Sequence, residues 1–371
     1  MRKHHPKNER IKRQYLFWLE EAKRLSPTSA DQAAAAIALF EASTGYKDFS
    51  AFNIEQARRF KRLQNEAVKP DNGKPLAKIT IHSRLMALKA FFHWLAGQPG
   101  YKSKISYSDS DYFNPSANDS RIATAKREKS APDLGQIRHV IKNMKSETII
   151  EQRDRALIAF AILTGARDDA LASMSLRHVN LEKHMVFQDA RDVRTKNRKT
   201  FTTWFFPVGD DLEMIVHGWI ATLKTKHLFG SGDPLFPQTR IGLDQDGQFS
   251  PLGIERKPWK NASAIRRIFS QAFAQAGLPY FNPHSFRTTL ARLGETLCRS
   301  PEEFKAWSQN LGHEHVLTTF RSYGEVPSHR QAEIINKLGN STQTTSPAFD
   351  PAAIAGLEAF LKSVKTSSGS I

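Results

Sequence analysis

The spacing of apolar residues over the first hundred positions predicts four helices. Over residues 8–25, apolar side chains recur every three or four positions, which is the period of one helix face. A capping-box pattern at Ser29 predicts an alanine-rich helix that ends at Gly45. Asn53 starts a third, basic helix in the same way, and residues 77–96 form a fourth that buries one apolar face. The four together predict a compact helical bundle.

Residues 98–131 lose this periodicity. They are rich in Ser, Asp, Asn, Tyr, Gly and Pro, and they end in a basic run. This composition is typical of a linker between two domains.

The second half of the chain predicts helices around one β-hairpin. Asp133 is placed to cap the first of them, and residues 151–166 form a helix that is apolar on most sides. Two runs, 184–194 and 200–208, predict a hairpin with a basic turn. Residues 238–260, rich in Gly, Gln and Asp, predict a loop without regular structure. Further helices are expected over 210–223, 262–276, 284–298, 301–311 and 328–338.

A tail follows a short link over residues 340–349. Asp350 is an N-cap and Pro351 the first helical position of a helix over 350–365. The apolar stripe of this helix consists of Ile354, Leu357, Leu361 and Val364.

These patterns predict a mainly α fold with a small β-hairpin or sheet in the C-terminal lobe. At 371 residues, the chain is too long for one ordinary core. We expect a helical domain over 1–115, a basic linker over 116–130, a second domain over 131–340 and a tail over 341–371.

The charge balance indicates a polyanionic partner. Lys and Arg number 54 against 37 Asp and Glu, a net charge of +17 that exceeds what solubility requires. Nucleic acid is the first expectation and an anionic membrane surface the second. The single cysteine, Cys298, excludes an internal disulfide and a cysteine-based zinc site. No apolar stretch reaches the about 18 residues of a membrane span, and the basic start lacks the apolar core of a secretory signal. We therefore expect a cytoplasmic, nucleoid-associated protein.

Polar and basic positions in the N-terminal half and the linker are the candidates for DNA contact. Such positions are often only solvated, but the net charge favours contact with the DNA backbone. The candidates are Thr80, Ser83, Arg84, Lys89, Arg121, Lys126 and Arg127.

Five residues spread over three segments carry the most informative chemistry. Arginine forks match phosphate oxygens, a histidine moves a proton near neutral pH, and a tyrosine hydroxyl can form a covalent phosphoester. Together they are what cleaving a phosphodiester with a protein nucleophile requires. They are Arg167 in TGARDDAL, His284 and Arg287 in PHSFRTTLA, and His313 and Tyr323 in LGHEHVLTTFRSYG.

The order and context of these motifs resemble the tyrosine recombinases of the phage-integrase family. The resemblance covers about residues 131–338. It implies two lobes that clamp duplex DNA, with the active site in the C-terminal lobe and a core-binding domain in the N-terminal half.

The resemblance also implies a role for each residue. Arg167 and Arg287 clamp the scissile phosphate, where charge grows on the non-bridging oxygens. His284 corresponds to the proton-transfer histidine, and His313 to the histidine that hydrogen-bonds the phosphate. Tyr323 corresponds to the nucleophile.

The lysine that protonates the leaving 5′ oxygen in this family lies in the β-hairpin turn. Here the turn offers two, Lys196 and Lys199. Lys196 follows a threonine, as that lysine often does, and Lys199 has the spacing to Pro207 of shorter family hairpins. The sequence leaves the choice between them open.

We therefore expect a site-specific DNA recombinase or integrase that works through a 3′-phosphotyrosyl intermediate. The intermediate retains the bond energy, so no cofactor, ATP or metal is expected, and the chain has no Walker-type phosphate loop. The alternatives are a type IB topoisomerase, a DNA-binding protein with a relic catalytic lobe and, least favoured, a metal hydrolase using His313, Glu314 and His315. The last is discounted because residues two apart face different sides of a helix.

The resemblance also implies an assembly. Recombination in this family uses a tetramer on two DNA duplexes, and C-terminal segments commonly dock on adjacent subunits. We expect a homo-tetramer, or a hetero-tetramer with a related recombinase, whose tail helix packs on a neighbouring subunit. The sequence does not identify the DNA site, accessory proteins or the direction of recombination.

Overall fold

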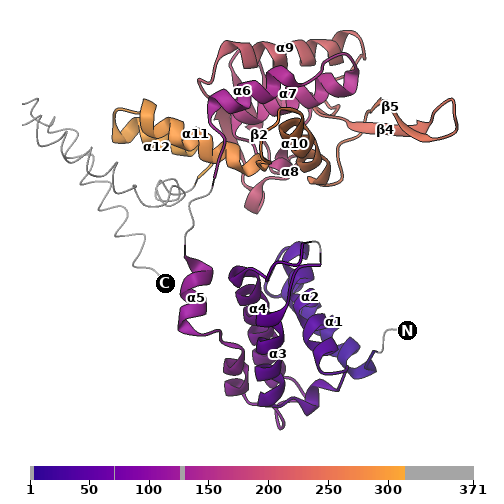
Figure 1. Cartoon of the computed structure of the whole chain (residues 1–371), viewed down its shortest axis with the longest axis vertical. Helices are drawn as coiled ribbons and strands as arrows, with labels where there is room; N and C mark the ends of the chain where they lie inside the picture. Colours follow the sequence, from indigo (N-terminus) through magenta and orange to yellow (C-terminus); the bar gives the residue numbers. More distant parts are fainter. Residues whose placement is uncertain (1–3, 71, 126–129, 314–371) are drawn as a thin grey trace, which may run out of the picture. The chain divides into compact units, whose positions relative to one another are not determined.

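The chain divides into two compact units, Met1–Lys126 and Arg127–Ile371 (Figure 1). The computed structural model describes residues 4–70, 72–125 and 130–313. Most described elements are helices, and the strands form two small antiparallel sheets. The expected fold class, mainly α with a small sheet in the C-terminal lobe, is confirmed.

The first unit is a helical bundle around an aromatic core. The rings of Phe40, Phe92 and Phe113 meet edge-on or stacked, with centroids 5.0–5.5 Å apart. Asn53 forms the expected capping box with Gln56. Ser29 is not a cap, because Ser26 caps that helix one turn earlier, ahead of Pro27. The helices are α1 (Pro6–Glu21), α2 (Pro27–Ser43), α3 (Ile54–Glu66) and α4 (Lys78–Ala96), with the 3-10 turn η1 (Phe49–Ala51).

The expectation of an unstructured linker from residue 98 is wrong. Tyr101, Ile105 and Phe113 are buried in the core of the first unit. The segment folds as the 3-10 helix η2 (Tyr107–Phe113) and the helix α5 (Ala117–Thr124), which pack against α4. The apolar residues are few and not spaced at 3.6 residues, so the sequence shows no helical stripe.

In the described region of the second unit, six α-helices accompany the central helix α7. Every residue of α7 from Ala156 to Thr164 is buried, as its apolar sequence predicts. Asp133 caps α6 through a capping box with Gln136. The helices are α6 (Leu134–Asn143), α7 (Ile149–Thr164), α8 (Asp168–Leu171), α9 (Asp210–Thr225), α10 (Ser263–Gln275), α11 (Pro283–Leu297) and α12 (Pro301–Asn310), and η3 (Leu176–His178) is a 3-10 turn.

The expected hairpin supplies two strands of a three-stranded sheet, and these strands are shorter than predicted. β1 (Val179–Asn180), β2 (Met185–Gln188) and β3 (Phe201–Trp204) pair in that order, with Gln188 opposite Phe201. Residues 189–200 leave the ladder and form a polar loop that contains the 3-10 turn η4 (Lys196–Arg198).

The expected loop over 238–260 is wrong as well. It contains a second hairpin, β4 (Gln238–Leu243) and β5 (Phe249–Glu255), which projects from the rest of its unit in Figure 1. Gly242, Gly253 and Pro251 lie within its strands, and residues of this kind hide a strand pattern.

Several expectations fall outside the described residues. They concern Lys126, Arg127, Tyr323, the helices over 328–338 and 350–365, and the link over 340–349. Among the helices that the structure describes, none is long and apolar enough to cross a membrane. Within residues 4–70, 72–125 and 130–313, no three His, Cys, Asp or Glu side chains are grouped to hold a metal ion.

Candidate active site

The site begins at the carboxyl end of α7, where Gly165 turns the chain. Gly165 has φ 59°, a left-handed conformation that favours glycine. A Cβ at this position would lie 3.0 Å from Leu290 and from Leu311, so the close packing also requires glycine. The carbonyl that this turn leaves without a helical partner accepts a hydrogen bond from Nη1 of Arg287 at 2.6 Å.

A second helix end presents His313. After α12, the amide of His313 donates to the carbonyl of Ser308 and that of Gly312 to Gln309. These two bonds form a Schellman motif, with Gly312 in the left-handed conformation at φ 69°. The Leu-Gly-His sequence therefore places His313 immediately beyond the end of α12.

Arg287 joins these two helix ends. Its side chain is 5% exposed, and Nη2 donates to the carbonyl of Leu311 and approaches Nε2 of His313 at 2.9 Å. A guanidinium can only donate, so Nε2 accepts and a neutral imidazole carries its proton on Nδ1.

Burial of the ring and the positive charges of Arg287, Arg167, His284 and Lys199 lower the pKa of His313 to about 4. His313 is therefore neutral near pH 7. The four charges that act on it come from α11, the start of α8 and the polar loop before β3. Candidates from Arg167 to Arg287, far apart in the sequence, thus act on one imidazole.

Arg167 lies at the N-cap of α8 and is half-buried. Burial lowers the pKa of its guanidinium, and the charge of Asp168 opposes that effect. The two carboxylates that follow it are engaged by other arginines. Arg266 binds Asp168 at 2.7 Å, and Arg194 approaches Asp169 at 3.4 Å.

His284 is the second residue of α11 and is exposed, whereas Arg287 lies one turn further and is buried. Asn282 caps this helix by accepting from the amide of Ser285. The histidine is therefore accessible to solvent, whereas the arginine one turn further lies in the interior of the unit.

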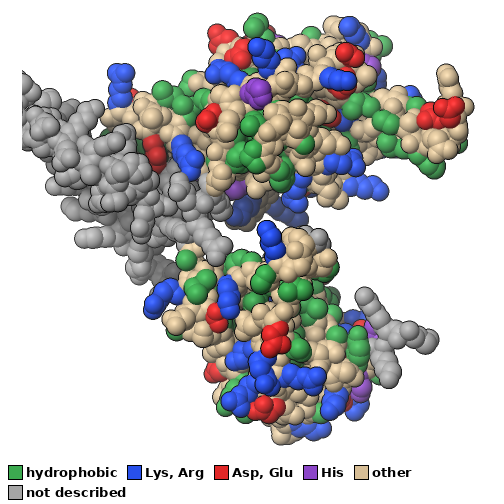
Figure 2. All heavy atoms as spheres, in the orientation of Figure 1, with side chains coloured by type: hydrophobic (Ala, Val, Ile, Leu, Met, Phe, Trp, Pro, Cys, Tyr) green, Lys and Arg blue, Asp and Glu red, His purple; other side chains and the backbone are tan. Residues whose placement is uncertain are grey.

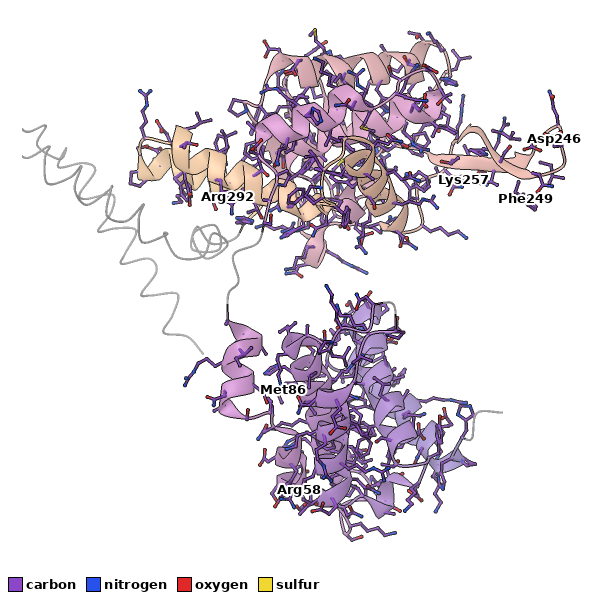
Figure 3. The ribbon with its side chains drawn as sticks, viewed as in Figure 1. Arg58, Met86, Asp246, Phe249, Lys257 and Arg292 are labelled. Carbon is purple, nitrogen blue, oxygen red and sulfur yellow. The ribbon has the colours of Figure 1, made fainter. Side chains whose placement is uncertain are left out.

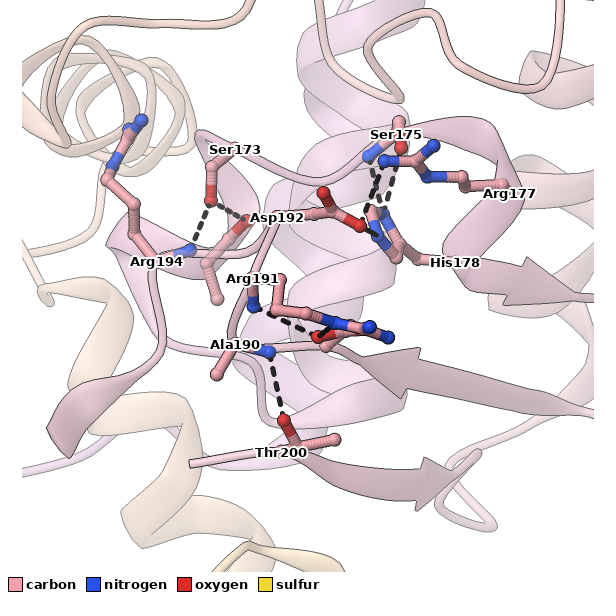
Figure 4. Close-up of polar contacts among 11 residues, drawn as sticks. Ser173, Ser175, Arg177, His178, Ala190, Arg191, Asp192, Arg194 and Thr200 are labelled. Carbon is pink, nitrogen blue, oxygen red and sulfur yellow. Dashed lines mark hydrogen bonds and ion pairs between the residues drawn. The ribbon is translucent and has the colours of Figure 1, made fainter. Parts of the chain in front are cut away.

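A polar network fixes the loop that carries the two candidate lysines (Figure 4). Thr200 accepts a hydrogen bond from the amide of Ala190, which closes the base of the loop at 3.1 Å. The amide of Arg194 donates to Ser173, and Asp192 pairs with Arg177 at 2.9 Å. The loop is therefore bound to the segment that follows α8.

Two groups in this network, Asp189 and His178, have pKa values shifted by their surroundings. Arg191 holds the pKa of the Asp189 carboxyl near 2 by hydrogen bonding. Buried His178 accepts at Nδ1 from the amide of Ser175 at 2.9 Å, which leaves its proton on Nε2, 3.7 Å from Asp192. Burial of the ring and the charge of Arg177 lower the pKa of His178.

The strand after this loop is fastened to the turn that presents His313. The side chain of Asn310 accepts from the amide of Trp204 at 2.7 Å and donates to its carbonyl at 2.8 Å. The ring of Phe201 packs so close to Gly312 that a Cβ there would lie 2.7 Å from it. This attachment brings the end of the loop toward His313.

The two candidate lysines differ in position. Lys199 is half-buried, and its charge is among those that lower the pKa of His313. Lys196 is exposed, in the 3-10 turn η4. Asn197 and Arg198 between them have positive φ, of 59° and 51°.

The described candidates for DNA contact lie on α4 and α5, and three have partners within their unit. Arg84 donates to Gln64, and Lys89 binds Asp111 and Asn114, each at 2.9 Å. Ser83 donates to the carbonyl of Ile79. Thr80 is partly buried, whereas Arg121 is exposed on α5.

The sequence reasoning missed a cationic cleft in the first unit. A cavity of about 580 Å³ lies between α3, α4 and the start of α5. Burial and the neighbouring Arg58 lower the pKa of Lys61. The basic run of α3, QARRFKRLQ, was the available signal. The cationic and imidazole side chains that line the cleft are Arg58, Lys61, Arg62, Lys78 and His82.

The comparisons with known proteins identify the family of the chain. Residues 133–329 match the model of the phage integrase family. The tyrosine recombinase XerC of Escherichia coli O157:H7 (strain EC4115 / EHEC) is 23% identical over 311 residues, which cover 82% of this chain and 88% of that one.

Two solved structures share the fold. A lambda integrase (75–356) dimer bound to a COC' core site superposes with a TM-score of 0.58 at 14% identity, covering 86% of this chain and 96% of that one. The Tn1549 transposon integrase in complex with circular intermediate DNA gives 0.55 at 13% identity, covering 88% and 99%.

The fold and the site define a DNA strand-exchange enzyme of the tyrosine recombinase class. The chain belongs to the phage integrase family. Its activity is site-specific recombination, in which DNA is cleaved and rejoined through a 3′-phosphotyrosyl intermediate. The topoisomerase and relic alternatives are not favoured.

Proposed function

We propose that Arg167, Arg287 and His313 bind the scissile phosphate of the recombination site. The observation that supports this is the contact of Nη2 of Arg287 with Nε2 of His313 at 2.9 Å, beside the charge of Arg167, which also lowers the pKa of that ring. As phosphorus becomes pentacoordinate, charge grows on its non-bridging oxygens, and fixed guanidinium donors stabilise it without reorganisation. The carboxylates of Asp168 and Asp169 beside Arg167 form ion pairs with Arg266 and Arg194.

Tyr323 is the proposed nucleophile. Its oxygen bonds to phosphorus as the bond to the 5′ oxygen breaks, and exposed His284 accepts the tyrosine proton. Lys199 gives a proton to the departing 5′ oxygen. A 5′ hydroxyl of the partner strand then attacks the phosphotyrosine and reverses each transfer, so no cofactor is consumed.

Lys199 is preferred to Lys196 because it is the half-buried lysine whose charge reaches His313. A general acid must lie within hydrogen-bond reach of the atom that it protonates. Lys196 stays the alternative.

The DNA-binding assignment extends to both units. Thr80, Ser83, Arg84, Lys89, Arg121, Lys126 and Arg127 are the proposed contacts from the sequence, and we add the cationic cleft of the first unit. Clustered cations release counterions from the DNA backbone and supply affinity without sequence preference. Figure 2 shows Lys and Arg side chains over both units, as this role requires.

The proposed assembly is a tetramer on two duplexes, homomeric or with a related recombinase, in which the tail helix docks on a neighbour. The lambda integrase structure is described as a dimer on its core site. We also propose that the protein acts in the cytoplasm, on the nucleoid.

One assay tests the function as a whole. The full chain is incubated with a nicked suicide duplex, without divalent metal, and covalent protein–DNA adducts are resolved on denaturing gels. The proposal expects an adduct and exchange between two short sites. An adduct with supercoil relaxation but no exchange would instead support the topoisomerase, and no adduct would overturn the function.

A further inference from the structure

The β4–β5 hairpin contributes no residue to the candidate active site, but it exposes large apolar side chains. It projects from the second unit on the side away from α11 and α12 (Figure 1), and Asp246 and Phe249 lie near its tip (Figure 3). Ile241 and Leu243 are each 59% exposed and Phe249 is 81% exposed.

The register shows that these apolar side chains share one face. Leu243 pairs with Phe249 and Ile241 with Pro251, and directly opposed residues point to the same side of a sheet. Alternation along each strand then puts all four on one face. The other face carries the intervening Gly242, which Leu252 covers so closely that a Cβ there would lie 2.6 Å from it.

An exposed apolar face on a two-stranded ribbon indicates a surface to which another molecule binds. Such a ribbon is marginally stable by itself and needs a surface for its apolar side. Contiguous exposed apolar residues in a folded protein commonly mark a site of interaction.

The base of the hairpin is held firmly. Arg153 is 2% exposed and donates to the carbonyl of Pro237 and to Thr239, each at 3.0 Å, while its guanidinium stacks over Trp259. Asp154 pairs with this arginine at 2.7 Å, which offsets the cost of burying its charge.

The second strand is anchored as well. Arg256, just beyond β5, donates to the carbonyls of His227 and Leu228. The direction of the hairpin is therefore fixed relative to the second unit, as a docking arm requires.

The charge of the tip indicates the partner. Asp244 and Asp246 lie in the turn, and Figure 2 shows acidic side chains at the end of the hairpin. A face of aliphatic and aromatic side chains that ends in carboxylates is repelled by DNA phosphates. It is complementary to a basic protein surface, and this chain itself carries a net charge of +17.

We infer that the apolar face of the β4–β5 hairpin docks on a second copy of this chain when copies occupy adjacent DNA sites. The inference rests on the proposed function, because recombination brings copies together on DNA. Ile241, Leu243, Phe249 and Pro251 supply the buried centre of the contact, and Asp246 supplies attraction at its rim.

The first test compares binding to DNA with one half-site and with both half-sites, using duplexes mapped from joints recovered in cells. Leu243→Thr combined with Phe249→Thr keeps β propensity but removes the apolar face. Asp246→Lys reverses the rim charge and spares Asp244, whose carboxylate accepts from two turn amides. The matched controls are Met214→Thr, 68% exposed on α9, and Glu182→Lys, exposed between β1 and β2.

We expect both arm variants to reduce cooperative filling of the second half-site by about tenfold or more, because interface anchors typically contribute most of a contact's energy. Single half-site affinity and covalent adduct formation on that half-site should match the controls. Unchanged cooperativity in both arm variants would overturn the inference, as would an equal loss of affinity on one half-site, which would indicate contact with DNA. Absence of an adduct from the unmodified chain would refute the proposed function instead, because cooperativity is measured without cleavage.

A crosslink identifies the partner directly. Cys298 is the only cysteine, so Phe249→Cys in a Cys298→Ser background can carry a single photoactivated crosslinker. A link between two protein chains, formed only on DNA with both half-sites, supports the inference. A link to DNA, or one within the same chain to its own C-terminal tail, overturns it.

Discussion

Nη2 of Arg287 lies 2.9 Å from Nε2 of His313, and the same nitrogen also donates to the carbonyl of Leu311. Its partner Nη1 donates to the carbonyl of Gly165. One buried side chain thus connects the ends of α7 and α12 and fixes the tautomer of the histidine. Arg287 therefore has a structural role that the half-buried Arg167 lacks.

The two arginines should differ in their effect on stability. Arg287→Ala leaves two buried carbonyls and an imidazole without their donor, and should lower the free energy of unfolding by about 2–4 kcal/mol. Arg167→Ala should lower it by about 1 kcal/mol or less. Each should reduce the cleavage rate about 10²–10³-fold, because each removes a donor to the transition state. Denaturant unfolding and single-turnover cleavage check the pair, and equal destabilisation by both would contradict this division.

His313 should titrate far below the usual histidine range. In the free protein its pKa should be about 4, because the ring is buried among positive groups. Arg167→Ala removes one of those charges and should raise this pKa, whereas Lys196→Ala should leave it unchanged. Nuclear magnetic resonance of isotope-labelled histidines measures it, with His313→Asn used to assign the signal.

The lowered pKa of His313 also makes the stability of the fold depend on pH in a defined direction. Above the ordinary histidine pKa of about 6.5, His313 is neutral in both the folded and unfolded states. As the pH falls from there toward 4, His313 binds a proton in the unfolded chain but not in the folded protein. The free energy of unfolding therefore decreases. A pKa of His313 near 6.5 in the free protein, or a variant His313→Asn with the same acid sensitivity, would contradict the packing described here.

The leaving group of the DNA can be changed to distinguish the roles of Lys199 and Lys196. Lys199→Ala should lower the cleavage rate about 10²–10⁴-fold, the usual contribution of a general acid, and Lys196→Ala much less. A duplex with a 5′-thiolate leaving group needs no proton and should restore cleavage by Lys199→Ala. Rescue of Lys196→Ala alone would transfer the role to Lys196.

Tyr323→Phe keeps the ring and removes the proposed nucleophilic oxygen. We expect normal folding and DNA binding, and no covalent adduct on a suicide duplex. Circular dichroism and gel-shift titration are the controls. An adduct that persists in this variant would exclude Tyr323 as the nucleophile.

Several helix boundaries could be predicted because local chemistry determines them. Asp133 and Asn53 cap helices as expected, and the helix expected over 301–311 ends at Asn310. The grouping of Arg167, His284, Arg287 and His313 was predicted only through the resemblance, since their contacts join distant segments. Spacing alone contains no information on such contacts.

Other parts were missed for physical reasons. Glycine and proline within β4 and β5 hide the alternation, so the hairpin was expected to be a loop. The segment from Tyr101 to Phe113 buries three large side chains without a helical period, so it was expected to be a linker. The choice between Lys196 and Lys199 depends on the fold of the polar loop, which neither the basic turn nor its spacing specifies.

Asn310 should act on catalysis without touching DNA. Its amide bonds both backbone groups of Trp204, which fastens β3 to the turn that presents His313. Asn310→Ala should cost about 1–2 kcal/mol of stability for the two lost hydrogen bonds. It should slow cleavage about tenfold to a hundredfold, because a displacement of about 1 Å in a reacting group has such an effect. The 5′-thiolate duplex should recover most of that loss, since the displaced group is Lys199, whereas the loss in Arg167→Ala should persist on the same duplex. Asn310→Asp keeps the acceptor for the Trp204 amide, so its cleavage rate should lie between those of the unmodified protein and Asn310→Ala. If Asn310→Ala cleaves both duplexes at the unmodified rate, the attachment of β3 to α12 does not position the lysine.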